Sequence, residues 1–84
     1  VFNPSTGQVQ ARVALASVEE VNAAVASALA AQEAWAATNP QRRARVMFEF
    51  KRLIERDMQP LAELLSSEHG KVIADSKGDI QRGL

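Results

Sequence analysis

The chain has 84 residues, with no cysteine, one histidine, ten basic and ten acidic residues, and a formal net charge of zero. The absence of cysteine excludes disulfides, thiolate nucleophiles and cysteine zinc sites from these residues, and one histidine cannot build a His-rich metal site. The balanced charge argues against binding to nucleic acid or to a membrane, and no apolar run approaches the roughly 20 residues of a membrane span. We therefore expect a small soluble intracellular domain, or part of a larger one, without a metal site.

The start of the chain has the pattern of extended structure. Apolar and polar side chains alternate between residues 9 and 15, which is the period of a strand. The segment 3–7 contains a proline that fixes φ in a turn and a glycine that can adopt positive φ. We expect a β-hairpin over about residues 1–16, in which Phe2 ends a first strand that looks cut and Gln8 begins its partner.

Four helices are predicted after the hairpin. Ser17 and Glu20 have the spacing of a capping box, and apolar residues follow at helical spacing up to Trp35. Asn39 suits an N-cap, and Pro40 suits the first turn of the second helix. The helices are expected at about residues 18–37, 40–57, 60–69 and 72–84.

Proline and glycine separate the last three of these helices. Pro60 is incompatible with the interior of one long helix, so we expect a break near residues 57–59, with Asp57 or Met58 as a cap. Gly70 is expected to end the third helix in the left-handed conformation. The last helical pattern runs to the end of the chain without a cap. We therefore expect a mostly α fold with an N-terminal β-hairpin, which is not closed by itself.

The basic cluster of Arg42, Arg43 and Arg45 lies in the first turn of the second helix, where the helix dipole disfavours cations. A phosphate-bearing ligand or nucleic acid would offset that cost, and so would acidic neighbours or solvent. We favour the second explanation, because no aromatic residues interleave with the arginines as they do in nucleic-acid platforms. The chain also has no glycine-rich phosphate loop and no serine nucleophile motif.

Two further charged positions are candidates for a site. His69 precedes Gly70 at a helix end, where an imidazolium would interact with the last carbonyl groups, so we interpret it as structural. Arg82 follows Asp79 by three residues. The two side chains form either a surface ion pair or a site in which the arginine fork receives a substrate carboxylate through two hydrogen bonds.

Four motifs occur in an order that resembles a known family. They are N-P-S-T-G at residues 3–7, R-R-A-R-V-M-F at 42–48, E-H-G-K at 68–71 and G-D-I-Q-R-G at 78–83. The first and third resemble the aldehyde dehydrogenase superfamily in general. Together, the four resemble the CoA-acylating methylmalonate-semialdehyde dehydrogenases. The resemblance covers nearly the whole chain but only a small part of such an enzyme.

The resemblance implies that the chain is an N-terminal piece of the α/β NAD-binding domain, and that it is inactive alone. In that family a cysteine forms a thiohemiacetal, a hydride passes to NAD⁺, and coenzyme A attacks the resulting thioester. The catalytic residues and the contacts to NAD and coenzyme A would then lie outside this segment, so we expect no cofactor to bind it. Arg82 matches the arginine that is proposed to bind the semialdehyde carboxylate.

The resemblance also implies a partner, a subcellular location and a metabolic pathway. The rest of the dehydrogenase chain would be the partner, in a homotetramer of the bacterial cytoplasm or the mitochondrial matrix, within valine and inositol catabolism. Two alternatives remain open. One is a non-acylating aldehyde dehydrogenase, in which water hydrolyses the thioester. The other is a free-standing helical interaction or nucleic-acid-binding module that uses Arg42, Arg43 and Arg45.

Overall fold

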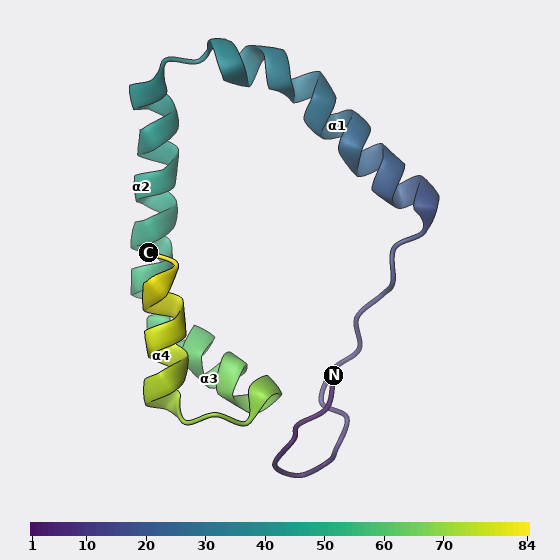
Figure 1. The fold of residues 1–84 in the computed structure, drawn as a ribbon, viewed down its shortest axis with the longest axis vertical. Helices are drawn as coiled ribbons and strands as arrows, with labels where there is room; N and C mark the ends of the chain where they lie inside the picture. Colours follow the sequence, from purple (N-terminus) through teal and green to yellow (C-terminus); the bar gives the residue numbers. More distant parts are fainter. The chain divides into compact units, whose positions relative to one another are not determined.

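The computed structural model describes all 84 residues, and they form four helices, as predicted (Figure 1). The helices are α1 at Val18–Ala37, α2 at Pro40–Arg56, α3 at Met58–His69 and α4 at Ile73–Arg82. The chain divides into two compact units, one of Val1–Val13 with Phe48–Leu84 and one of Ala14–Met47. No helix is both long enough and apolar enough to pass through a bilayer.

The predicted β-hairpin over residues 1–16 is wrong. The only β-pairing is one isolated antiparallel bridge between Phe2 and Val9, and residues 10–17 have no regular structure. A strand is stable only when its backbone groups pair along a ladder. The other backbone bonds between the two segments join Asn3 to Gln8 and join Gln10 and Ala11 to Val1, so no continuous ladder runs along the alternating residues.

The turn between these two segments does form. The amide of Gly7 donates to the carbonyl of Asn3 at 2.8 Å, and the amide of Asn3 donates to the carbonyl of Gln8 at 2.9 Å. Gly7 has a φ of 72°, which a glycine adopts without the steric cost of a Cβ atom. The motif at residues 3–7 therefore specifies a local turn and not a sheet.

Helix α1 begins with the predicted capping box. The Ser17 side chain accepts a hydrogen bond from the Glu20 amide at 3.2 Å, and the Glu20 carboxylate accepts one from the Ser17 amide at 2.7 Å. Two amides that lack partners inside the helix are thereby satisfied. Every residue of α1 is exposed, so its apolar stripe is not buried within its own unit.

The start of α2 has the predicted asparagine cap, and its exposed face has two ion pairs. The Asn39 side chain accepts from the Gln41 amide at 2.8 Å. Arg52 pairs with Glu49 at 2.6 Å, and Lys51 pairs with Glu55 at 3.6 Å. Each exposed pair contributes only a few tenths of a kcal/mol to helix stability.

Helix α3 begins at Met58, two residues before the predicted start. Pro60 is its third residue, and the first backbone bond of the helix runs from the Leu61 amide to the Asp57 carbonyl at 3.1 Å. The missing amide of Pro60 is therefore one that needs no partner inside the helix. Asp57 stands at the N-cap without a side-chain cap bond, because its carboxylate accepts hydrogen bonds from Arg56.

Helices α3 and α4 lie side by side (Figure 1). The fully buried residues are Ala62 of α3 and Ser76 of α4. The hydroxyl oxygens of Ser66 and Ser76 lie 2.8 Å apart and share a hydrogen bond. Small side chains let the two helices approach closely, and the serine pair satisfies the polar atoms that this approach buries.

Gly70 ends α3 in the left-handed conformation, as predicted, with a φ of 86°. Its amide donates to the Ser66 carbonyl at 2.8 Å. A Cβ atom at this position would lie 2.9 Å from Cγ of Pro4, so the N-terminal turn rests against the end of α3. The side chains of Gln10 and Ser67 form a second link between these segments, at 3.4 Å.

Gly70→Ala should destabilise the chain by about 1–2 kcal/mol, because alanine is strained at positive φ and its methyl group would displace Pro4. Gly78→Ala is the matched control. It adds the same methyl group inside α4, where nothing lies within 4 Å, and should stabilise by up to about 1 kcal/mol. The measurement is the midpoint of thermal unfolding by circular dichroism. A Gly70→Ala variant that melts at or above the unmodified chain would contradict the argument.

Candidate functional site

Three charged side chains meet where α4 packs against the end of α3. Asp79 of α4 accepts a hydrogen bond from Lys71 through Oδ2 and another from Arg82 through Oδ1. Lys71 belongs to the short connection after Gly70, and Arg82 lies three residues beyond Asp79 on the same helix. The turn at Gly70 and the packing of the two helices therefore bring the three groups together. We call them the charge cluster.

The members of the charge cluster differ in exposure. The side chain of Lys71 is 22% exposed, that of Asp79 is 36% exposed and that of Arg82 is 78% exposed. Arg82 uses only Nη1 to bind Asp79, and a guanidinium has five N–H donors in a fixed fork. The edge formed by Nε and Nη2 makes no hydrogen bond within the chain, and the side chain as a whole is mostly exposed. Two cations and one anion leave the cluster with a net positive charge.

The hydrogen bond from Lys71 is the main cause that lowers the pKa of Asp79 below its usual value. Partial desolvation acts in the opposite direction, while the positive charges of Lys71 and Arg82 lower the pKa further. Because the folded pKa is depressed, the stability that this link contributes is fully present above the pKa of the unfolded chain. It is lost as the pH falls through the lowered value.

An apolar groove of about 570 Å³ lies beside the charge cluster. Its walls come from the end of α2 and from α3 and α4, with Phe50, Leu64 and Ile80 among the lining residues. Glu68 and Asp79 are its ionisable lining residues. The cluster therefore stands at the edge of an apolar surface, where a charged group is less well hydrated than in open solvent.

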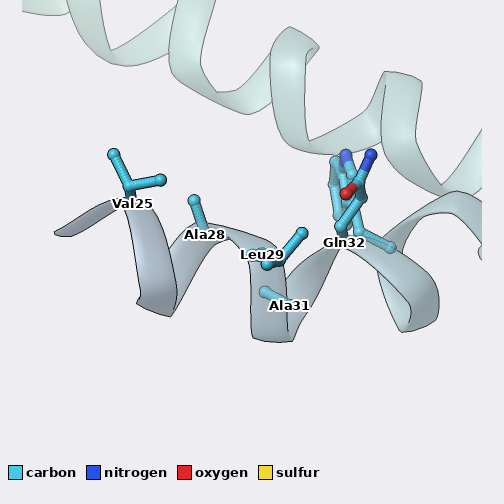
Figure 2. Close-up of a pocket in the computed structure, with 6 residues that line it drawn as sticks. Val25, Ala28, Leu29, Ala31 and Gln32 are labelled. Carbon is cyan, nitrogen blue, oxygen red and sulfur yellow. The ribbon is translucent and has the colours of Figure 1, made fainter. Parts of the chain in front are cut away.

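A second hollow lies along one face of α1 (Figure 2). Figure 2 shows the side chains of Val25, Ala28, Leu29 and Gln32 on the same side of the helix. Ala31 and Trp35 complete the lining. No lining residue is titratable, so this face offers apolar contact and no acid, base or nucleophile.

The other charged candidates do not join a site. Arg42, Arg43 and Arg45 form no ion pair. Nε of Arg43 is buried without a hydrogen-bond partner. His69 is the last residue of α3. No three side chains of His, Cys, Asp or Glu gather as metal ligands would.

Sequence reasoning found two members of the charge cluster and missed the third. It placed Asp79 and Arg82 together because they are three residues apart on one helix. It included Lys71 only within the E-H-G-K motif at residues 68–71. Lys71 and Asp79 are eight residues apart across a turn, so only the packing of α3 on α4 reveals their contact.

Comparison with known proteins gives consistent matches over the whole chain. The family model "Aldehyde dehydrogenase family" matches residues 1–84. The malonate-semialdehyde dehydrogenase of Pseudomonas aeruginosa is 42% identical over all 84 residues, which are 17% of that protein. The acylating, mitochondrial methylmalonate-semialdehyde/malonate-semialdehyde dehydrogenase of Homo sapiens is 39% identical, and the chain covers 16% of its length.

A solved structure matches more closely still. It is a protein of Sinorhizobium meliloti 1021, assigned as a methylmalonate-semialdehyde dehydrogenase and crystallised with NAD. It is 63% identical, with a TM-score of 0.95, over 100% of this chain and 17% of that one. The four helices are therefore those of the N-terminal part of an aldehyde dehydrogenase structure.

Replacing Lys71 with Met should raise the pKa of Asp79 toward its ordinary value, because the main cause of the depression is the hydrogen bond from Lys71. The measurement is an NMR titration of the Asp79 carboxyl carbon. Lys51→Met, which removes a lysine from the Lys51–Glu55 pair, is the control and should leave the Asp79 titration unchanged. An unchanged titration in Lys71→Met would show that the ion pair does not persist in solution.

Proposed function

The chain belongs to the aldehyde dehydrogenase family, and we propose that it is part of the NAD-binding domain of a CoA-acylating malonate- or methylmalonate-semialdehyde dehydrogenase. The complete enzyme would convert semialdehyde, coenzyme A and NAD⁺ to acyl-CoA and NADH. The observation that carries this proposal is the 63% identity, at a TM-score of 0.95, with a protein assigned as a methylmalonate-semialdehyde dehydrogenase and crystallised with NAD. The human relative is an acylating dehydrogenase, which supports the use of coenzyme A.

In this proposal Arg82 binds the carboxylate of the semialdehyde. Such a substrate is an anion, unlike most aldehydes, so a site that selects it needs a cation. Arg82 is mostly exposed and has a free edge of two donors, Nε and Nη2. Such an edge binds a carboxylate by donating two parallel hydrogen bonds to it. Its position on a helix gives the fork a rigid base.

The rest of the chemistry would come from other parts of the enzyme. The 84 residues include no cysteine, and the thioester route requires a thiolate nucleophile. They also include no glycine-rich loop between a strand and a helix, so they do not fit the phosphate groups of NAD. We propose that this chain alone neither oxidises aldehydes nor binds a cofactor, and that it contributes a substrate-binding side chain.

Coenzyme A distinguishes the proposed reaction from hydrolysis. The complete enzyme is supplied with malonate semialdehyde and NAD⁺, with and without coenzyme A, and the products are identified by mass spectrometry. We expect acyl-CoA to form in step with NADH. Free acid as the product, with or without coenzyme A, would instead show a non-acylating aldehyde dehydrogenase.

Arg82→Leu in the complete enzyme should lower kcat/KM for the carboxylated semialdehyde by about 10- to 100-fold, mainly through KM, because charge-assisted hydrogen bonds are lost. An uncharged aldehyde of similar length, such as propanal, should be affected little. Arg52→Leu is the matched control, since it removes an exposed arginine with the same i,i+3 partner spacing. Equal losses on both substrates would assign Arg82 a structural role.

A further inference from the structure

We propose that Lys71 is a specificity-determining residue for the carboxylated substrate, because it keeps the fork of Arg82 available. This inference rests on the proposed function of Arg82. Lys71 would act through Asp79 and would not touch the substrate. Lys71 binds one carboxylate oxygen of Asp79. Asp79 can then contact Arg82 at Nη1 without occupying its Nε–Nη2 edge.

The other arginine–carboxylate pairs show what happens without such a lysine. Glu49 accepts from Arg52 through both oxygens, from Nε at 2.8 Å and from Nη2 at 2.6 Å. Asp57 binds Arg56 in the same way, also at 2.8 and 2.6 Å. In both pairs the carboxylate fills the Nε–Nη2 edge, which is the edge that would receive a substrate carboxylate bidentately.

The Asp79–Arg82 pair differs in just this respect. Asp79 contacts Arg82 through Oδ1 and Nη1, and its Oδ2 accepts from Lys71. Spacing alone does not explain the difference, because Glu49–Arg52 has the same i,i+3 separation. The distinguishing feature is the ammonium group of Lys71, which competes for the carboxylate and leaves Nε and Nη2 of Arg82 free.

Charge adds to this geometric effect. Asp79 by itself would neutralise Arg82 and place a negative charge close to the incoming carboxylate, which repels it. Lys71 compensates that charge, so the cluster retains one net positive charge toward an anion. Lys71 is only 22% exposed, so its attraction to Asp79 is screened less by solvent and salt than that of an exposed pair.

Loss of Lys71 has two consequences that act in the same direction. Asp79 becomes free to bind Arg82 through both oxygens, as in the other two pairs, and the cluster loses its net positive charge. Both weaken the binding of a carboxylated substrate, and neither affects an uncharged aldehyde. Removing the charge of Asp79 as well should reverse both consequences, because Lys71 acts only through Asp79.

The test uses the complete enzyme, with steady-state kinetics on malonate semialdehyde and on propanal. Lys71→Met should raise KM for the semialdehyde by about three- to tenfold, the effect of a partly exposed ion pair, with kcat and the propanal kinetics unchanged. Lys71→Arg should keep the low KM because it retains the charge. Lys51→Met, in an ion pair at 3.6 Å with Glu55, is the matched control and should change neither substrate.

The deciding variant is Lys71→Met combined with Asp79→Asn, which should recover most of the lost semialdehyde affinity. A double variant no better than Lys71→Met alone would overturn the inference, and so would a Lys71→Met variant that loses activity equally on both substrates. The two proposals fail separately. If Arg82→Leu shows no selectivity, the proposed role of Arg82 fails, whereas a selective Arg82→Leu with an unaffected Lys71→Met refutes only the role of Lys71.

Discussion

The left-handed backbone at Gly70 is the constraint on which the packing of residues 58–84 depends. It ends α3 and turns the chain so that α4 packs on α3 through Ala62 and Ser76, the fully buried residues of the structure. The same turn places Lys71 opposite Asp79. Only glycine fits there without strain, because φ is 86° and a Cβ would meet Pro4. One backbone conformation thus determines both a helix pair and a cluster of charges.

The helices present large apolar side chains that are exposed within their own units. Leu29 of α1 is 68% exposed, and Phe50 and Leu64, which line the apolar groove, are each 56% exposed. Contiguous apolar patches of this kind mark surfaces that contact another structure. The chain spans about 17% of the length of its relatives. Under the proposed function, the remainder of the dehydrogenase would supply the partner for these faces.

Sequence reasoning succeeded where structure depends on neighbours in the chain. The capping box of Ser17 and Glu20 and the glycine end of α3 each involve residues a few positions apart, and all formed as predicted. The β-hairpin failed because alternation specifies a strand only when a partner is available, and Phe2 provides one bridge. The contact of Lys71 with Asp79 was missed because it depends on helix packing. Spacing left Arg82 open between a surface ion pair and a carboxylate-binding site, and the family resemblance favoured the second.

A receptor for a carboxylate faces conflicting requirements, and under the proposed function the charge cluster meets them. An exposed arginine is mobile, so binding a ligand costs side-chain entropy unless a neighbour holds it. A carboxylate can hold the arginine through a hydrogen bond. In the Glu49–Arg52 pair, however, the carboxylate occupies the Nε–Nη2 edge of the arginine and neutralises its positive charge. A cation bound to the second oxygen of the carboxylate leaves the Nε–Nη2 edge unoccupied and restores a net positive charge. Lys71 has that position on Asp79, which leaves Arg82 held at one nitrogen and still able to bind an anion with the other two.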